Sequence, residues 1–177
     1  SVNTYLQPRA WYRYSAASRQ ARKTALGENS PVSTADLEVV REFAVSKDGT
    51  RVPLNIIRKK GLALDGSHPA LLNAYGGYSV SLGPAFTAQL RSLFDRGFVY
   101  VVANLRGGGE YGEQWHLAGN LTRKQNVFDD FAAAAKHLID KGYTKPARLA
   151  IQGGSNGGLL MGAALTQHPE LFGAVVS

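Results

Sequence analysis

The chain has 177 residues, of which 44% are hydrophobic and 19% are charged, a balance typical of a folded globular protein. No apolar run approaches the roughly 18 residues that a membrane-spanning helix needs, so we expect no membrane partner. The absence of cysteine excludes a disulfide framework, a thiolate zinc site and a cysteine nucleophile. It is compatible with both the cytoplasm and a bacterial periplasm, so the localisation stays open.

The net charge of +7 is unevenly distributed along the chain. Residues 1–60 carry 11 Lys and Arg against 5 Asp and Glu, whereas the remaining residues carry 9 against 8. The basic residues of the first third are scattered, and they form no tight cluster of the kind that binds nucleic acid. We therefore expect a solvated basic surface and no nucleic-acid partner.

The first third of the chain predicts strands joined by polar turns. The aromatic and basic residues 11–14 indicate a lone strand within residues 1–23, and residues 24–36 are predicted to form a loop or linker. Residues 37–45 and 52–58 then predict a hairpin, because Lys-Asp-Gly-Thr at 47–50 is a turn sequence.

From residue 70 onward, strand and helix patterns alternate. Strands are predicted at 70–74, 98–103, 149–152 and 173–176, and helices at 86–96, 126–141 and 156–168. In the second of these helices, Asp129 and Asp130 would occupy the first turn, where the helix dipole stabilises carboxylates. The alternation predicts an α/β fold with a mostly parallel sheet and flanking helices.

The strongest chemical signal is the pattern Gly-x-Ser-x-Gly at Gly153, Ser155 and Gly157. A predicted strand precedes it and a predicted helix follows, which is the context of a nucleophile elbow. The two glycines leave room for a tight, strained turn that presents the Ser155 hydroxyl. The same turn would direct the N–H of Asn156, at the helix N-terminus, toward a developing oxyanion. An incidental serine in a glycine-rich turn is the alternative.

A second loop, at residues 73–78, follows a short buried strand, where α/β-hydrolases form the other half of the oxyanion hole. Gly76 and Gly77 would let the backbone approach a substrate, and Tyr75 could donate its phenolic O–H. The alternative is an ordinary turn with two packing tyrosines.

Residues 104–112 contain a third glycine-rich loop. Gly107, Gly109 and Gly112 formally match the dinucleotide pattern G-x-G-x-x-G, but the residues that follow are polar and are broken at 119–120. A Rossmann loop would open directly into an amphipathic helix. We therefore expect no dinucleotide and instead predict a rigid ligand-binding loop at the carboxyl end of a strand, with Arg106 in contact with substrate.

No histidine is a convincing general base for Ser155. In this fold the acid and the histidine follow the serine, yet only 22 residues follow it here. His168 lies about 20 Å along the predicted helix from Ser155. No clustered metal ligands are visible, so we expect no metal and no cofactor.

Taken together, residues 69–177 closely resemble the prolyl oligopeptidase family of serine peptidases. The matching runs are 74–78 (Ala-Tyr-Gly-Gly-Tyr), 104–113 (Asn-Leu-Arg-Gly-Gly-Gly-Glu-Tyr-Gly-Glu), 115–116 (Trp-His), 124–126 (Lys-Gln-Asn), 128–131 (Phe-Asp-Asp-Phe) and 153–160 (Gly-Gly-Ser-Asn-Gly-Gly-Leu-Leu). The asparagine after Ser155 resembles the prolyl oligopeptidase branch, because oligopeptidase B relatives tend to carry alanine there.

The resemblance implies a mechanism and a substrate. Ser155 would attack the carbonyl after proline in a short peptide and form an acyl-enzyme, while Asn156 N–H and Tyr75 O–H hold the oxyanion. Tyr78, where the family more often has phenylalanine, would line the proline pocket, and Gly76 and Gly77 would lie against the substrate. The catalytic Asp and His of the family would lie beyond Ser177.

The resemblance also implies a division of the chain. Residues 1–36 would be the end of a β-propeller and a linker, and residues 37–177 the N-terminal part of an α/β-hydrolase peptidase domain. Because residues 172–177 form an apolar run without a closing turn, we expect a piece of a longer protein. Its partners would be the rest of its own chain, and alone it would be inactive. Alternatives are another α/β-hydrolase, such as an esterase or acylaminoacyl peptidase, and a non-catalytic interaction domain.

Overall fold

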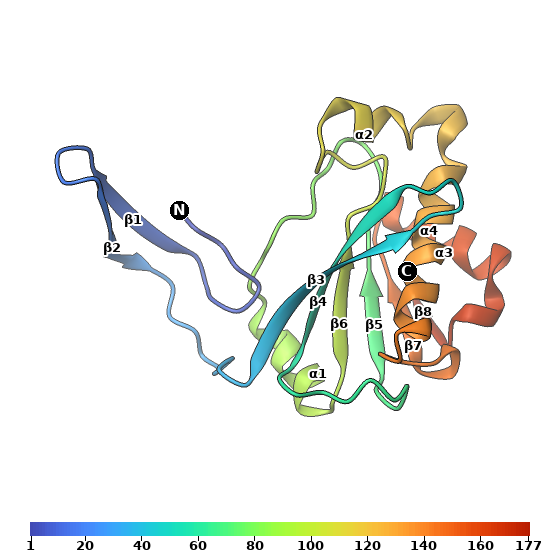
Figure 1. Ribbon diagram of the computed structural model, residues 1–177, viewed down its shortest axis with the longest axis horizontal. Helices are drawn as coiled ribbons and strands as arrows, with labels where there is room; N and C mark the ends of the chain where they lie inside the picture. Colours follow the sequence, from blue (N-terminus) through green and yellow to red (C-terminus); the bar gives the residue numbers. More distant parts are fainter.

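Two separate β-sheets organise the chain, and the computed structural model describes all 177 residues. The smaller sheet is a hairpin of β1 (Ala10–Ser15) and β2 (Gln20–Gly27), which projects away from the rest of the molecule (Figure 1). The larger sheet has six strands in the order β3-β4-β6-β5-β7-β8. These are β3 (Leu37–Val45), β4 (Arg51–Lys59), β5 (Ala70–Asn73), β6 (Val99–Ala103), β7 (Leu149–Gln152) and β8 (Ala174–Val176).

The helices connect the strands of the larger sheet. They are α1 (Arg91–Asp95), α2 (Glu113–Leu117), α3 (Gln125–Asp140) and α4 (Asn156–Gln167), with short 3-10 turns η1 (Ala88–Leu90), η2 (Leu121–Arg123), η3 (Pro146–Arg148) and η4 (Pro169–Leu171). None of them is both long enough and apolar enough to cross a membrane.

The pairing of the strands determines where the loops meet. β3 pairs with β4 and β4 with β6 in antiparallel fashion, whereas β5, β6, β7 and β8 are joined by parallel pairs. β5 lies between β6 and β7. The carboxyl ends of these three parallel strands therefore share one edge of the sheet, and the loops that follow Asn73, Ala103 and Gln152 converge there.

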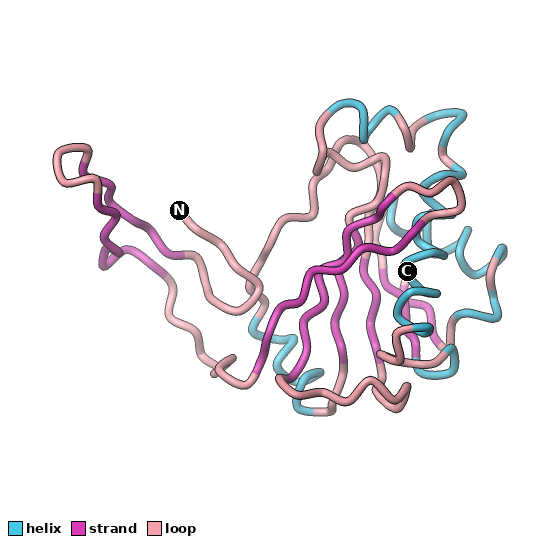
Figure 2. The backbone as a smooth tube through the Cα atoms, viewed as in Figure 1, coloured by secondary structure: helices cyan, strands magenta, loops and turns pink.

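Each face of the sheet is covered by a different apolar cluster. The larger cluster joins alternate residues of the strands to α3 and α4, including Phe131, Leu138 and Leu160, which are fully buried. Figure 2 shows both helices on the same side of the strands. A smaller cluster contains Leu37, Ile57 and Phe94 of α1. Because the larger cluster packs α3 and α4 against the strands, it fixes the helix that follows Ser155.

The structure confirms the predicted 37–58 hairpin, the alternation of strands and helices after residue 70, and the helix that follows Ser155. Two predictions in the first half were wrong. Residues 24–27 belong to strand β2 rather than to a loop, because residues 20–27 pair with the strand that we had predicted to be alone. The helix predicted at 86–96 is only a 3-10 turn and five α-helical residues, since Thr87 provides no side-chain cap for a longer helix.

The prediction for Asp129 and Asp130 was also wrong. Helix α3 begins at Gln125, one residue earlier than we expected, so both residues lie just past its first turn. The Asp130 side chain is completely buried and pairs with Arg106. The Asp130 carboxylate is therefore stabilised by a specific cation, Arg106, and not by the helix dipole.

Candidate active site

Ser155 occupies the sharp turn between β7 and α4. Its backbone lies in a strained region, with φ at 55° and ψ at −119°, and the residue is exposed. A Cβ on Gly153 would lie 2.6 Å from the Gly157 carbonyl oxygen, and a Cβ on Gly157 would lie 2.9 Å from the Ala74 carbonyl oxygen. Only glycine fits these two approaches. The turn therefore has the geometry that the Gly-x-Ser-x-Gly pattern predicts.

The loop after β5 lies directly against this turn. Gly76 has a φ of +62°, and a Cβ on Gly77 would overlap the side-chain amide of Asn156. The Asn156 Nδ2 donates a hydrogen bond to the Tyr75 carbonyl oxygen at 2.6 Å. The loop of Tyr75 and the first residue of α4 are thus in contact, as the oxyanion-hole hypothesis requires. As that first residue, Asn156 also has a backbone N–H without an intrahelical partner.

Lys124, to which our sequence reasoning gave no role, joins the same contacts. Its Nζ donates to the Gly76 carbonyl oxygen at 2.8 Å and to Asn156 Oδ1 at 3.0 Å. Burial lowers the pKa of the Lys124 ammonium. One signal in the sequence could have revealed it, because a lysine directly before an amphipathic helix occupies the end where cations are disfavoured.

A cavity of about 400 Å³ opens beside the elbow. It is lined by Gly77, Tyr78, His116, Gly119, Asn120, Leu121, Lys124, Asn156 and Leu159. Tyr78, Leu121 and Leu159 are large apolar or aromatic residues that are 77%, 86% and 59% exposed. Two of them, Tyr78 and Leu121, have positive φ values of 53° and 45°. Strained residues and exposed apolar groups around one hollow are typical of a binding site.

Backbone packing accounts for two glycines of the 104–112 loop, Gly107 and Gly109. A Cβ on Gly107 would lie 2.8 Å from the Gly76 carbonyl oxygen, and a Cβ on Gly109 would overlap the Ser79 carbonyl. A Cβ on Gly119 would overlap the Gly107 nitrogen. These glycines let three loops pack together behind the cavity.

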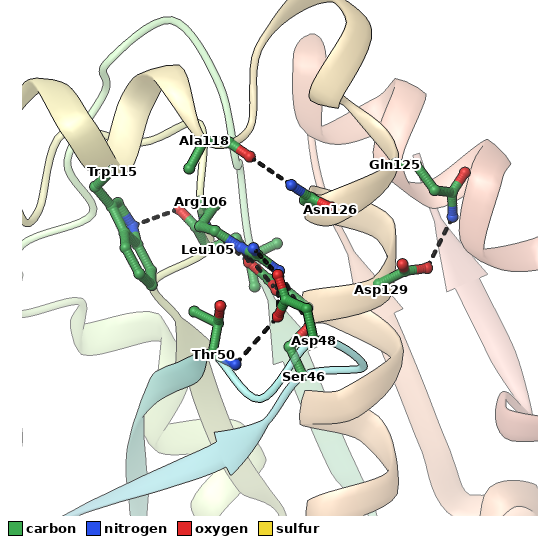
Figure 3. A network of polar contacts seen from close by, with 11 residues as sticks. Ser46, Asp48, Thr50, Leu105, Arg106, Trp115, Ala118, Gln125, Asn126 and Asp129 are labelled. Atoms are coloured by element: carbon green, nitrogen blue, oxygen red, sulfur yellow. Dashed lines mark hydrogen bonds and ion pairs between the residues drawn. The ribbon is translucent and has the colours of Figure 1, made fainter.

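Arg106 is not among the residues that line the cavity, so the structure does not support its predicted contact with substrate. The residue is only 4% exposed. Its guanidinium donates to Asp130 at 2.6 and 2.9 Å and also to Asp48 and Ser46 (Figure 3). The backbone N–H of Arg106 donates to the same Asp130 carboxylate at 3.1 Å. The physical reason is that a buried guanidinium requires buried acceptors, and Asp130 supplies them.

Two further bonds in Figure 3 hold the segment that follows Arg106. The indole N–H of Trp115 donates to the Leu105 carbonyl oxygen at 2.9 Å, and Asn126 Nδ2 donates to the Ala118 carbonyl oxygen at 2.8 Å. Helix α2 is thereby fastened to the end of β6 and to the start of α3. This segment carries His116 and Gly119 to the wall of the cavity.

The side chains of three histidines are engaged elsewhere than at Ser155. His116 Nδ1 lies 2.9 Å from the Gly107 carbonyl oxygen, His137 Nε2 lies 2.5 Å from Glu42, and His168 Nδ1 lies 3.4 Å from Glu170. No group of three or more His, Asp or Glu side chains could hold a metal ion. None of these three imidazoles forms a hydrogen bond with Ser155.

A serine on a strained strand–turn–helix, at the carboxyl edge of parallel strands, defines part of an α/β-hydrolase fold. The model of the prolyl oligopeptidase family matches residues 84–177. The chain belongs to this family.

Similar proteins agree with this assignment. Over 129 residues, covering 73% of this chain and 18% of the relative, it is 49% identical to a prolyl endopeptidase of Elizabethkingia meningoseptica. A solved structure from a study of two prolyl endopeptidases superposes with a TM-score of 0.92 at 49% identity, covering 98% of this chain and 25% of that one. A post-proline cleaving enzyme from Rickettsia typhi superposes with a TM-score of 0.86 at 37% identity, covering 98% and 25%. The chain thus spans a quarter or less of the length of these proteins.

Proposed function

We propose that the full-length protein containing this chain is a serine peptidase that cleaves short peptides after proline through an acyl-enzyme on Ser155. The observation that carries the proposal is the contact between the elbow and the loop of Tyr75, made through the 2.6 Å bond from Asn156 to the Tyr75 carbonyl oxygen. This contact supports the proposal, because it brings Tyr75 and Asn156, the two proposed oxyanion donors, next to Ser155 at one edge of the sheet. Membership of the family supports the same reading.

In the proposed reaction, the Ser155 hydroxyl adds to the carbonyl carbon of the prolyl residue and gives its proton to a histidine outside this chain. The carbonyl oxygen becomes an oxyanion that accepts hydrogen bonds from the Asn156 N–H and the Tyr75 O–H. When the intermediate collapses, the peptide C–N bond breaks and the leaving amine takes the proton. Water then adds to the acyl-enzyme by the same route and releases Ser155.

The cavity beside the elbow is the proposed place for substrate. Tyr78 would offer its ring to the prolyl side chain, and Gly76 and Gly77 would let the backbone of the substrate approach closely.

Residues 37–177 would then be the first part of the peptidase domain. Residues 1–36 would be the end of a β-propeller and its linker. Because the base and its acid partner lie outside residues 1–177 in this proposal, the isolated chain would not hydrolyse peptides.

The test uses the full-length protein and its Ser155→Ala variant. We expect a fluorophosphonate probe to add one label to the wild type and none to Ser155→Ala, as read from the intact mass. We expect a chromogenic amide of Gly-Pro to be hydrolysed faster than the matched Gly-Ala amide or a short acyl ester. Ser155→Ala should lower hydrolysis by about 10⁶-fold.

A Ser92→Ala variant, on helix α1, is the matched control and should keep wild-type turnover. Retained hydrolysis in Ser155→Ala would exclude Ser155 as the nucleophile. Faster turnover of the acyl ester than of the Gly-Pro amide would show that the protein is an esterase and not a prolyl peptidase. Turnover by the isolated chain would show that the base lies within residues 1–177.

A further inference from the structure

The side chain of Lys124 completes a chain of hydrogen bonds between two loops of the candidate active site. Its ammonium reaches the Gly76 carbonyl oxygen at 2.8 Å and Asn156 Oδ1 at 3.0 Å. The amide of Asn156 then donates to the Tyr75 carbonyl oxygen at 2.6 Å. Three bonds therefore fasten the loop that carries Tyr75 to the residue whose backbone N–H opens helix α4.

The position of this lysine is unfavourable for stability. Lys124 precedes the first residue of the 16-residue helix α3, where the helix dipole repels a cation. It is partly buried, and it forms no ion pair with any carboxylate. Two neutral oxygens and the ring of Phe128, whose centroid lies 6.0 Å from Nζ, compensate for its lost hydration. Residues that break local sequence rules tend to mark functional sites.

The contact that Lys124 maintains is a tight one. The α-carbon of Gly77 lies so close to the Asn156 amide that a Cβ would overlap it. Oxyanion donors act only when they lie about 2.7–3.1 Å from the oxygen that they stabilise. Since a misplacement of about 1 Å lowers a rate by about 10²-fold, the separation of these two loops controls catalysis.

We propose that Lys124 is a positioning residue for the oxyanion hole. Its ammonium holds the loop of Tyr75 and Gly76 at a fixed distance from Asn156, so that the Tyr75 O–H and the Asn156 N–H point at the same oxygen. Lys124 acts through these two donors and does not itself bind the oxyanion. The inference rests on the proposed function, since an oxyanion hole contributes to catalysis only if Ser155 attacks a carbonyl.

The first experiment compares Lys124→Met with wild type in the full-length protein. We expect kcat to fall by about 10- to 100-fold while KM stays within about twofold, because only transition-state contacts are lost. The affinity for a peptide aldehyde, which forms a tetrahedral adduct with Ser155, should fall by the same factor. The affinity for the product peptide should not change. Lys136→Met, at an exposed position of the same helix, is the matched control and should behave as wild type.

The second experiment restores the ammonium chemically. The chain has no cysteine, so Lys124→Cys introduces a single thiol into it. Alkylation with 2-bromoethylamine rebuilds an ammonium at nearly the length of lysine, whereas iodoacetamide adds a neutral amide. We expect the first treatment to restore most of kcat and the second to restore little, with the wild type treated in parallel. Equal rescue by both reagents, or by neither, would overturn the role of the ammonium.

These measurements separate the two proposals. A wild-type protein that neither hydrolyses a Gly-Pro amide nor reacts with the fluorophosphonate would refute the proposed function, and the inference with it. An active wild type with an equally active Lys124→Met variant would refute the inference alone. If KM rose and product affinity fell by as large a factor as kcat fell, Lys124 would be an ordinary binding residue. The positioning role would then be wrong.

Discussion

Two cationic side chains fasten loops to the neighbourhood of helix α3, and they do so in opposite ways. Arg106 is 4% exposed, and its principal acceptor is the fully buried Asp130 carboxylate. Lys124 lies at the wall of the cavity, and its acceptors are the neutral oxygens of Gly76 and Asn156. One cation thus pairs with a carboxylate inside the protein, and the other has only neutral acceptors beside the candidate active site.

The different acceptors of Arg106 and Lys124 follow from the different roles that we propose for the two regions. In the proposed reaction, a carboxylate next to the oxyanion hole would repel the negative charge that develops there, so neutral acceptors are the better partners for Lys124. Behind the cavity no such charge develops, and the stronger carboxylate pair is preferred for Arg106. Substitutions in the Arg106 region should therefore change stability, while those in the Lys124 region should change turnover.

The largest expected effect on stability comes from Asp130→Asn. The substitution removes a charge that pairs with Arg106 through both its guanidinium and its backbone N–H. Breaking a buried ion pair on one side destabilises a protein by about 3–5 kcal/mol. We expect a loss of this size in the free energy of unfolding, measured by urea denaturation of the full-length protein. The kcat per fluorophosphonate-titrated site should fall less than in Lys124→Met.

Asp129→Asn is the control for this change, since it removes the same charge from the neighbouring position. Asp129 accepts a hydrogen bond only from Gln125, at 2.9 Å and exposed to solvent. We expect its effect to stay within about 0.5 kcal/mol. Equal losses in the two variants would show that the buried pair with Arg106 adds nothing.

The largest expected effect on turnover among the oxyanion donors comes from Tyr75→Phe. It removes the phenolic O–H while leaving the Tyr75 carbonyl, which accepts from Asn156, in place. Loss of one oxyanion donor lowers kcat by about 10²-fold or more, so we expect a decrease of that order with little change in urea stability. Tyr111→Phe, on the adjacent loop, should retain wild-type kcat. An unchanged rate in Tyr75→Phe would remove Tyr75 from the oxyanion hole.

These two regions also differ in how far the sequence predicted them. The elbow and the loop of Tyr75 were predictable, because glycines at fixed spacing after buried strands leave few backbone geometries. Arg106 and Asp130 were misassigned because their partnership spans 24 residues and leaves no local pattern. A polar residue on a helix looks the same in sequence whether it faces solvent or a buried guanidinium. Lys124 was missed for the same reason, since its acceptors lie 48 residues before it and 32 after it.

The errors in the first half of the molecule have a different origin. The strand of residues 20–27 is exposed along most of its length, so no apolar alternation marks it, and only its pairing with β1 makes it a strand. The short helix α1 shows the reverse case. The apolar spacing of residues 86–96 indicated a long helix, but Phe94 is the only buried residue of α1, and Leu90 of η1 packs beside it.

A smaller effect on turnover is expected from Gly77→Ala. The added methyl group would overlap the Asn156 amide and push the loop of Tyr75 away from α4. We expect kcat to fall by about tenfold, on the scale of a displacement below 1 Å. Gly83→Ala is the matched control, because nothing lies within 4 Å of its Cβ and it should retain wild-type kcat. If Gly77→Ala kept full kcat, the close approach of the two loops would not matter for catalysis.

The smallest expected effect is a change in acid stability caused by Asp48→Asn. The hydrogen bond from the Arg106 guanidinium lowers the pKa of Asp48 from 3.8 to about 2. Because the folded pKa is depressed, the ionised carboxylate stabilises the folded state above about pH 4, and this contribution is lost as the pH falls toward 2. The Asp48 side chain is 48% exposed, so solvent screening limits the contribution to about 1 kcal/mol or less. Asp48→Asn should therefore lower urea stability slightly at pH 6 and not at pH 2. A difference from wild type that is the same at both pH values would show that the Asp48 charge is not its cause.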